Sequence, residues 1–367
     1  MRIGVPKEIK DRENRVALTP DGAQQLAAGG HEVVVQHGAG TGSGFADDAY
    51  AAAGAKLGST AEAWDSELVL KIKEPLEPEY EHLGRQILFT YLHLAGVAPA
   101  LTDALLAAGT TAIAYETVED EAGRLNLLAP MSAVAGAMTA TVGNRYLAAH
   151  EGGKGTFLGR LLGRRSGSVL VIGTGTVGRH AAHAAAGLGA RVRIAGLRED
   201  RIEEIQAEIG PDPEFILSTP ENIALATRDA DLVVGAVLLR GAKAPHVVTE
   251  AMVRAMQPGS VIVDVSIDQG GCVETARPTS HSDPVYTEHG VVHYCVTNMP
   301  GAYPRTSTIA LTTATLPYAT RLAERGLDAL RDDPGFRKGL NVHDGAINCR
   351  AVAEALGKRD TYREFEV

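Results

Sequence analysis

Four side chains that can hold an anion or move a proton follow predicted strands of this chain. Arg15 follows the first strand, RIGVP, and Lys73 ends the stretch LVLKIKEP. His93 ends ILFTYLHLA, and Asp268 follows VIVDVSIDQGG. Ligands of open α/β sheets bind outside the carboxyl ends of the strands, so we expect these side chains to converge on one cleft. Each taken singly has an ordinary alternative, a solvated surface charge or a hydrogen-bonded histidine.

A Gly-rich turn lies in the stretch SVLVIGTGTVGRHAAHAAAGLGA, where G-x-G-x-x-G follows a strand pattern and precedes a helix of small residues. Gly173 permits the tight turn, Gly175 lets the backbone approach a pyrophosphate, and Gly178 lets the helix pack on the strand. Thr176 and Val177 stand at the start of that helix, whose N-terminus faces the anion. This context predicts dinucleotide binding.

The following strand lacks the acid that usually binds the ribose hydroxyls of NAD. RVRIAG ends at Gly196, and Leu197 and Arg198 come next. A carboxylate there would repel a 2′-phosphate, so its absence favours acceptance of NADP, and Arg198 and Arg201 are close enough in sequence to add positive charge. Alternatively, both arginines are surface residues of the next helix, and the ribose relies on backbone groups and Ser218.

The elements that must position these residues alternate between strand and helix. Strand patterns with β-branched residues are separated by helical patterns that end in glycine, which predicts mostly parallel, doubly wound sheets. The strand-like runs are RIGVP, HEVVVQ, LVLKIK, ILFTYL and TAIAYE in the first third, then SVLVIG, RVRIAG, EFILS, LVVGAV, SVIVDV and VHYCV; the first helical runs are DGAQQLAAGG, FADDAYAAAG and PALTDALLAAG.

A length of 367 residues favours two domains. The stretch APMSAVAGAMTATVGNRYLAAHEGG predicts a connecting helix of small residues with Ser132 as its N-cap, and TSTIALTTATLPYATRLAERG predicts a second long helix kinked at Pro317. The mainly helical tail should return to the first domain. We therefore predict an α/β fold of two doubly wound parallel-sheet domains, with a Rossmann domain (129–305) inserted into a discontinuous substrate domain (1–128 plus 306–367).

Composition excludes some classes of function. A net charge of −10 argues against sequence-independent nucleic-acid binding, and no apolar run is long enough to span a membrane. The N-terminus has no signal core, so we expect a cytoplasmic protein. Cys272, Cys295 and Cys349 are interpreted as thiols buried in a reducing compartment. No convincing cluster of metal ligands is present, and no metal is predicted.

Taken together, these features resemble the alanine dehydrogenase family, which also includes the nucleotide-binding subunit of proton-translocating transhydrogenase. Matching stretches run in order from residue 1 to about 318, and one more lies in the tail at 338–346. They are MRIGVPKEIKDRENRVALTP, LVLKIKEP, ILFTYLHLA, TAIAYETV, LLAPMSAVAG, GAVLLRGAKAP, VDVSIDQGGCVETARPT, YCVTNMPG, TSTIALTTATLPY and KGLNVHDGA. The chain departs from the family pattern at Gly196, where the family has Asp.

The resemblance implies oxidative deamination of L-alanine to pyruvate and ammonium, with hydride passing to NAD or NADP. Arg15 and Lys73 would hold the substrate carboxylate, and His93 and Asp268 would be the acid–base groups, on different domains that close over the substrate. Together with the Gly-rich turn and the residues around Gly196, the residues expected to line the cofactor are Ser132, Thr176, Arg201, Ser218, Val237, Leu238, Val265, Ser266, Ile267, Asp268, Arg277, Val296, Thr297, Asn298 and Met299.

Other functions remain open at this point. A transhydrogenase-like nucleotide subunit would carry hydride between cofactors and would not need Arg15, Lys73 or His93. A non-catalytic protein that senses NAD(P)H would bind the cofactor without turnover, and a related enzyme would act on a larger amino acid. The resemblance suggests a hexamer, with the helix at 133–149 either an interface between subunits or an intramolecular helix between domains.

Overall fold

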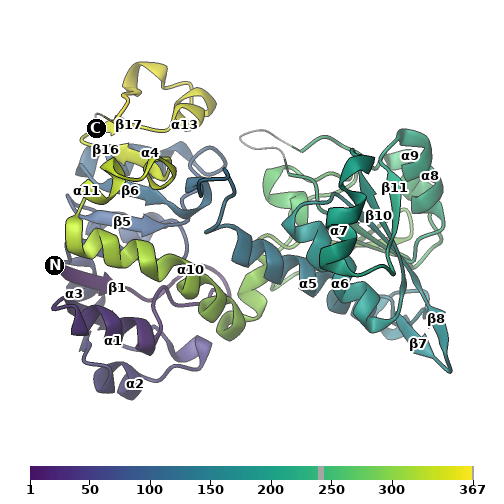
Figure 1. The fold of residues 1–367 in the computed structure, drawn as a ribbon, viewed down its shortest axis with the longest axis horizontal. Helices are drawn as coiled ribbons and strands as arrows, with labels where there is room; N and C mark the ends of the chain where they lie inside the picture. Colours follow the sequence, from purple (N-terminus) through teal and green to yellow (C-terminus); the bar gives the residue numbers. More distant parts are fainter. Residues whose placement is uncertain (239–243, 366–367) are drawn as a thin grey trace. The chain divides into compact units, whose positions relative to one another are not determined.

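The computed structural model of the chain describes residues 1–238 and 244–365. It divides into two compact units, the first formed by Met1–Met131 with Gly301–Val367 and the second by Ser132–Pro300. Each unit contains one large sheet (Figure 1). Residues 239–243, part of the matching stretch GAVLLRGAKAP, lie outside the described residues.

The sheet of the first unit has six parallel strands and two antiparallel strands at one edge. Its order is β17-β16-β6-β5-β4-β1-β2-β3. The strands are β1 (Arg2–Val5), β2 (Glu32–Gln36), β3 (Lys56–Gly58), β4 (Leu68–Leu70), β5 (Ile87–Thr90), β6 (Thr111–Ala114), β16 (Leu340–His343) and β17 (Ala346–Ile347).

Helices of this unit connect the parallel strands and pack on them. One example is α1, which begins where Thr19 accepts a hydrogen bond from the Gly22 amide and Pro20 takes the first helical position. The α-helices are α1 (Pro20–Ala28), α2 (Asp47–Ala52), α3 (Thr60–Trp64), α4 (Pro99–Ala108), α10 (Pro304–Arg325), α11 (Asp328–Arg331), α12 (Pro334–Arg337) and α13 (Arg350–Ala355), and the 3₁₀ turns are η1 (Thr41–Ser43), η2 (Glu77–His82), η3 (Tyr115–Thr117) and η8 (Arg359–Thr361).

The C-terminal tail is mainly helical, as the sequence predicted, but it also contains two short strands that the sequence interpretation missed. After α10, the tail adds β16 next to β6 and then β17, so it completes the sheet of the first unit. Both strands are short, and a Gly-containing turn at 344–345 joins them, which left no extended alternating pattern to recognise. The tail therefore contributes strands as well as helices to this unit.

The sheet of the second unit has the strand order of a dinucleotide-binding fold. Its order is β11-β10-β9-β12-β13-β15-β14, in which β14 alone is antiparallel, and its first five strands follow the 3-2-1-4-5 arrangement. The strands are β9 (Ser168–Ile172), β10 (Arg191–Gly196), β11 (Glu214–Leu217), β12 (Leu232–Gly235), β13 (Val261–Asp264), β14 (Val285–Glu288) and β15 (Val291–Tyr294), and β7 (Gly159–Leu161) with β8 (Arg164–Ser166) forms a separate hairpin.

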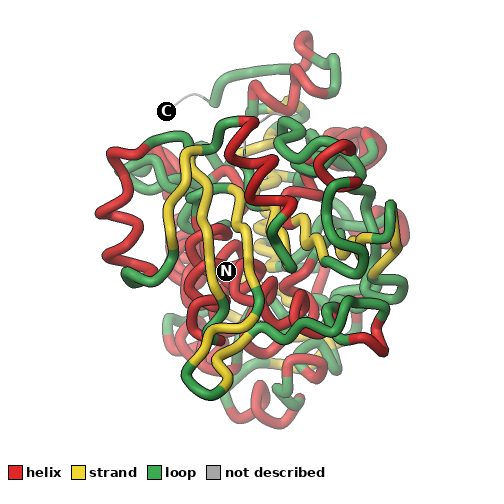
Figure 2. Tube along the Cα trace, turned by 90° about the vertical axis from the view of Figure 1, so that its right-hand side faces the viewer, coloured by secondary structure: helices red, strands yellow, loops and turns green. Residues whose placement is uncertain are grey.

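Helices cover both faces of this second sheet. Val169 and Val171 of β9 pack in one apolar cluster with α6 and α7, whereas Leu170 and Ile172 pack in another with α8 and α9. Figure 2 faces this unit and shows the strands in yellow with helices in red on either side. The helical segments are α5 (Ala129–Tyr146), α6 (Thr176–Leu188), α7 (Ile202–Ile209), α8 (Pro220–Arg228), α9 (Glu250–Arg254), η4 (Ala149–Glu151), η5 (Glu199–Arg201), η6 (Val265–Gln269) and η7 (Met299–Ala302).

The predicted α/β fold class is confirmed, with parallel-dominated sheets that carry antiparallel edge strands. One prediction about α5 was wrong: Ser132 is not its N-cap, because the helix already begins at Ala129, with Pro130 in its first turn. The small residues of α5 serve packing inside the second unit. A Cβ added to Gly136 would lie 2.9 Å from the His180 Cβ of α6, so glycine allows the two helices to approach closely.

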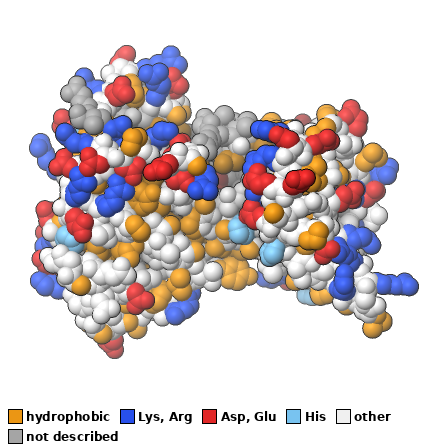
Figure 3. Space-filling model, in the orientation of Figure 1, with side chains coloured by type: hydrophobic (Ala, Val, Ile, Leu, Met, Phe, Trp, Pro, Cys, Tyr) orange, Lys and Arg blue, Asp and Glu red, His pale blue; other side chains and the backbone are white. Residues whose placement is uncertain are grey.

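Several surface and composition features bear on the classes of function. Among the described residues, no helix is long and apolar enough to cross a membrane. Cationic and anionic side chains are interspersed on the face shown in Figure 3. Cys272 and Cys295 are buried free thiols, and Cys349 is a free thiol that is only partly buried. No stripe of one charge sign is visible on this face.

Candidate active site

Three predicted residues of the first unit follow the carboxyl ends of neighbouring strands, so they lie at the same end of the sheet. Strands β6, β5, β4 and β1 are adjacent and parallel. Arg15 lies in the segment after β1, Lys73 follows β4, and His93 follows β5. The carboxyl ends of parallel strands lie at the same end of the sheet. The three segments are therefore placed together where ligands of α/β sheets usually bind.

Arg15 is buried and is oriented by a carboxylate two residues away. Its Nε donates to Glu13 Oε1 at 2.7 Å and its Nη2 donates to Glu13 Oε2 at 2.5 Å. Burial by itself would lower the pKa of Arg15, but Glu13 outweighs burial and raises it, so the guanidinium remains charged. Its Nη1 lies 3.1 Å from Met131 Sδ. The result is a fixed planar cation inside the unit.

The segment that carries Lys73 is held by the buried carboxylate of Glu8. Glu8 Oε1 accepts from the amides of Ile72 (2.7 Å) and Lys73 (3.4 Å), and Glu8 Oε2 accepts from Lys71 Nζ at 3.0 Å. Lys71 Nζ also donates to Glu79 Oε1 at 2.7 Å. Burial alone would lower the pKa of Lys71, whereas these two carboxylates raise it. A buried ionic cluster therefore fixes the backbone from which Lys73 extends.

His93 has an unusual backbone conformation, and its imidazole stacks on the ring of Tyr91. Its φ is +49°, in the left-handed region that non-glycine residues seldom adopt. The Tyr91 ring stacks against the imidazole with 5.7 Å between centroids, and Tyr91 Oη donates to the Leu127 carbonyl at 2.7 Å. The side chain of His93 is 41% exposed, so it can reach a ligand while its base is held.

In the second unit, the Gly-rich turn leaves room for a phosphate. Gly173 has a φ of +115°, and a Cβ there would lie 2.8 Å from the Ala236 carbonyl carbon. A Cβ on Gly178 would lie 2.8 Å from the Gly173 carbonyl carbon, whereas one on Gly175 would meet no atom within 4 Å. Because no side chain caps α6 at Gly175, the backbone N–H groups of its first turn face this space. These features fit the pyrophosphate of a dinucleotide.

Most other residues expected to line the cofactor follow the carboxyl ends of parallel strands in the same sheet. The exceptions are Ser132, in the first turn of α5, and Arg277, whose guanidinium carbon lies 3.9 Å from the Tyr286 ring centroid. The strand-end residues are Leu197, Arg198 and Arg201 after β10, Ser218 after β11, Val237 and Leu238 after β12, Val265 to Asp268 after β13, and Val296, Thr297, Asn298 and Met299 after β15.

The end of β10 has no acid, and its space is filled. A Cβ on Gly196 would lie 2.7 Å from Thr174 Cγ2 and 2.8 Å from Phe215 Cε2. The nearby arginines have local partners: Arg198 is paired with Asp200, and Arg201 Nη2 lies 2.9 Å from Glu204 Oε1. Both arginines are therefore engaged in surface ion pairs.

Asp268 is exposed on η6, and a buried aspartate holds that segment. Asp264, at the end of β13, accepts hydrogen bonds from the amides of Ser266 (2.9 Å), Cys272 (2.8 Å) and Val273 (3.1 Å). Burial raises the pKa of Asp264, and these amide donors oppose the rise. The bonds lie on both sides of Asp268 and close the segment into a fixed loop.

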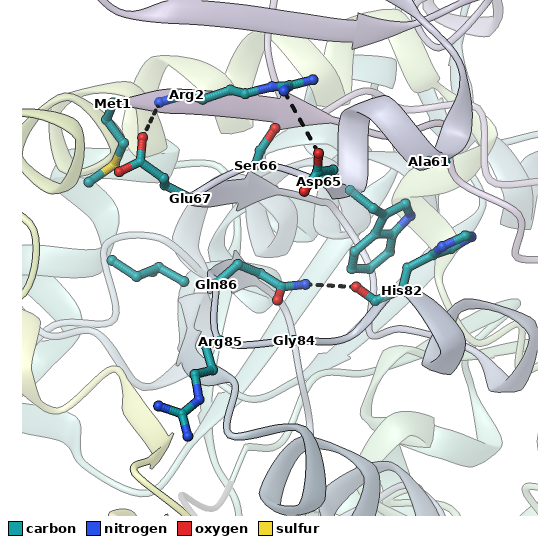
Figure 4. A pocket seen from close by; sticks show the side chains of 12 residues that line it. Met1, Arg2, Ala61, Asp65, Ser66, Glu67, His82, Gly84, Arg85 and Gln86 are labelled. Carbon is teal, nitrogen blue, oxygen red and sulfur yellow. Dashed lines mark hydrogen bonds and ion pairs between the residues drawn. The ribbon is translucent and has the colours of Figure 1, made fainter.

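A separate pocket of about 810 Å³ lies in the first unit, away from these residues (Figure 4). Its lining includes Arg2, Ser66, Glu67 and Ile87, which lie at or before the amino ends of β1, β4 and β5, at the opposite edge of the sheet from Lys73 and His93. Arg2 contacts two of its carboxylates: the backbone amide donates to Glu67 Oε2 at 2.6 Å, and Nη1 lies 3.9 Å from Asp65 Oδ2. This pocket is not the predicted site. Among the described residues, no group of three or more His, Cys, Asp or Glu could hold a metal ion.

The sequence interpretation missed four carboxylates that support the predicted residues: Glu8, Glu13, Glu116 and Asp264. Glu116 is the clearest omission, because it follows the strand TAIA just as the other residues follow theirs. Its carboxylate accepts hydrogen bonds from the backbone beside His93. Position after a strand was thus a usable signal for Glu116, whereas the contacts of Glu8 with the amides of Ile72 and Lys73 join residues 64 and 65 positions apart.

Comparisons with known proteins agree with this arrangement. An alanine dehydrogenase from Bacillus subtilis (strain 168) is 53% identical over 97% of this chain and 95% of its own length. One from Mycolicibacterium smegmatis is 49% identical over 97% of both chains. A solved structure of an L-alanine dehydrogenase superposes with a TM-score of 0.93 at 47% identity, covering 97% of this chain and 99% of that one. A transhydrogenase structure from Sinorhizobium meliloti, at 24% identity and a TM-score of 0.80 over 96% of this chain and all of that one, shares the fold.

Family models match nearly the whole chain. The model for the N-terminal domain of alanine dehydrogenase/PNT matches residues 4–135, and the model for the C-terminal domain matches residues 139–350. These two matches, together with the relatives above, show that the chain belongs to the alanine dehydrogenase/PNT family.

Proposed function

We propose that the chain catalyses the reversible oxidative deamination of L-alanine to pyruvate and ammonium. The observation that carries this proposal is the placement of Arg15, Lys73 and His93 at the carboxyl ends of neighbouring parallel strands. It is supported by relatives of similar length, about half identical, that are named alanine dehydrogenase. The chain is accordingly an oxidoreductase that acts on a small amino acid.

Arg15 and Lys73 hold the substrate carboxylate. L-alanine offers few groups for recognition, so two cations supply most of its orientation. Glu13 fixes the plane of the Arg15 guanidinium, and Glu8 fixes the backbone of Lys73. A preorganised pair loses little conformational entropy when the substrate binds.

His93 and Asp268 perform the proton transfers. When bound, a nicotinamide would supply the acceptor for the hydride that leaves Cα of alanine, and the amine would become an iminium. Water adds to the iminium carbon and loses a proton, and the resulting carbinolamine collapses to pyruvate and ammonia. Imidazole is suited to these transfers near neutral pH, and the exposed carboxylate of Asp268 accepts the proton from water and stabilises the cationic iminium.

The Gly-rich turn and α6 would hold the cofactor. The open space over Gly175 and the amides at the start of α6 suit its pyrophosphate. Acceptance of NADP, besides NAD, is supported by the missing acid at Gly196. A 2′-phosphate would recruit Arg198 and Arg201 only by competing with Asp200 and Glu204, which now pair with them.

The test is oxidation of NADH and of NADPH, measured side by side at 340 nm, with pyruvate and ammonium. Turnover that requires both pyruvate and ammonium supports the proposal, and the ratio of the two cofactors gives the preference. Cofactor binding without turnover would instead favour a sensor, and hydride exchange between two nicotinamides without pyruvate would favour a transhydrogenase-like subunit. Glyoxylate and 2-oxobutyrate serve as controls for substrate breadth.

The hexamer, inferred from the resemblance, and the cytoplasmic location, inferred from the amino-acid sequence, remain predictions. Light scattering coupled to gel filtration measures the mass of the assembly directly. A mass below that of a hexamer would reject the hexamer and would leave the catalytic proposal unaffected. Fractionation of the host cell tests the second.

A further inference from the structure

The turn that carries His93 needs an explanation, because a residue other than glycine seldom adopts its conformation. His93 has a φ of +49°, and histidine, unlike glycine, meets steric resistance in the left-handed region. The turn directly follows β5 and leads to the Gly96 amide, which donates to the His93 carbonyl at 2.7 Å. Such a conformation persists only when surrounding groups determine it.

The group that determines it is the carboxylate of Glu116. Glu116 lies in η3, directly after β6, the parallel neighbour of β5. Its Oε1 accepts from the His93 amide at 2.6 Å, and its two oxygens accept from the Leu92 amide at 3.3 and 3.2 Å. The side chain of Glu116 is only 12% exposed. Hydrogen bonds to a shielded carboxylate are stronger than those between neutral groups, so Glu116 holds both amides of the turn.

The same carboxylate also faces the imidazole. Glu116 Oε1 lies 3.9 Å from His93 Nδ1, beyond hydrogen-bonding distance but close for a charge. The Tyr91 ring is stacked parallel to the imidazole, with an interplanar angle of 2°. The ring of His93 therefore lies between two side chains, Tyr91 and Glu116.

We propose that Glu116 is a positioning residue for His93: it fixes the left-handed turn and faces the imidazole, which it holds ready for proton transfer. This inference rests on the proposed function, in which His93 moves the protons. Glu116 itself does not touch the substrate. Its effect is confined to His93, because Arg15 and Lys73 are held by other carboxylates, Glu13 and Glu8.

The test compares Glu116→Ala and Glu116→Gln with a matched control, Glu119→Gln. The glutamine variant keeps one acceptor oxygen for the turn and loses the charge, and the alanine variant loses both. Glu119 lies three residues further along the same segment, where its Oε2 accepts a hydrogen bond from Lys338 Nζ at 2.7 Å. The control therefore removes a carboxylate from this region and leaves the histidine turn intact.

We expect kcat for alanine oxidation to fall about 100-fold in Glu116→Ala and about tenfold in Glu116→Gln, since a small displacement of a catalytic group costs this much. The KM for L-alanine should change by less than about threefold, and NADH binding by fluorescence should be unchanged. The isotope effect from deuterium at Cα should fall towards 1 while the solvent isotope effect rises, because proton transfer becomes the slow step. Glu119→Gln should match the unsubstituted chain in all five measurements.

A purely structural role would give a different pattern. Loss of folded enzyme lowers activity in proportion to the active fraction and leaves both isotope effects unchanged; that result, or an unchanged kcat in Glu116→Ala, would overturn the inference. A crystal structure of Glu116→Ala in which His93 keeps its left-handed φ would overturn it as well. The proposed function fails separately, if the unsubstituted chain shows no turnover with pyruvate, ammonium and either cofactor.

Discussion

Three glycines of the nucleotide-binding unit can be compared by replacing each with alanine, because the added methyl group would meet a different environment at each position. Gly178 is buried in the first turn of α6, Gly175 precedes that helix, and Gly187 lies near its exposed end. A Cβ on Gly178 would lie 2.8 Å from the Gly173 carbonyl carbon, and one on Gly175 or Gly187 would meet nothing within 4 Å. Replacing each with alanine separates packing, cofactor approach and helix propensity.

The sizes of the three effects follow from these surroundings. Gly178→Ala would push against backbone, which cannot rotate away, so we expect a loss of about 3 kcal/mol or more in the free energy of unfolding. Gly187→Ala should stabilise α6, and with it the folded protein, by about 0.5–1 kcal/mol, and should raise the Tm of the protein by about 2–4 °C. Gly175→Ala should leave stability within about 1 kcal/mol, yet weaken NADH binding at least about tenfold, because the methyl group occupies the space for the pyrophosphate.

Thermal unfolding and NADH fluorescence titration on the three variants measure both quantities. Gly187→Ala is the control, since it changes the same helix far from the turn. Equal NADH affinity in Gly175→Ala and Gly187→Ala would show that the pyrophosphate does not lie over Gly175. An unchanged free energy of unfolding in Gly178→Ala would show that the close contact between α6 and the turn tolerates an added methyl group.

Three further changes test single features of the site. Arg15→Lys keeps a charge beside buried Glu13 but loses the planar fork, so the KM for L-alanine should rise about tenfold; an unchanged KM would place the carboxylate elsewhere. Gly196→Asp should move the ratio of kcat/KM for NADPH over NADH towards NADH by about tenfold, after Phe215 shifts to admit the side chain, and a constant ratio would mean that the ribose is recognised by other groups. Burial raises the pKa of Glu74, but Lys10 and Lys73 outweigh burial and lower the pKa below its ordinary value of 4.5. The Glu74 carboxylate therefore stabilises the folded state above pH 4.5, and this contribution is lost as the pH falls further. The difference in unfolding free energy between the chain and Glu74→Gln should therefore shrink in acid, and a difference independent of pH would contradict this.

The sequence predicted the alternation of strands and helices and the class of fold, because buried parallel strands leave runs of β-branched residues with glycine at the helix ends. Strands such as β9 and β13 were recognisable from five or fewer residues. The short strands β16 and β17 were missed, since their place in the sheet depends on pairing with β6, more than 200 residues earlier in the chain. Local pattern carries no information about such a partner.

The same distinction separates the residues of the site. Arg15, Lys73 and His93 were recognisable because each follows a strand, and topology alone brings them to one edge. The support from Glu8 was not recognisable, because its contacts with the amides of Ile72 and Lys73 join residues 64 and 65 positions apart. Likewise, the crowding of Gly196 by Phe215 comes from a neighbouring strand, so the sequence indicated that the acid was absent but not what fills its place.

The late position of β16 and β17 has a consequence for synthesis on the ribosome. All strands of the second unit, which ends at Pro300, have been made before residues 340–347 leave the ribosome, whereas β6 still presents an unpaired edge during that interval. An open strand edge is a site for pairing with another chain, so the nascent protein passes through a stage that is prone to aggregation. A chain that stopped before residue 340 would retain every proposed catalytic and cofactor-binding residue and yet remain in that stage permanently. The last strands of this protein thus protect its first half rather than build its active site.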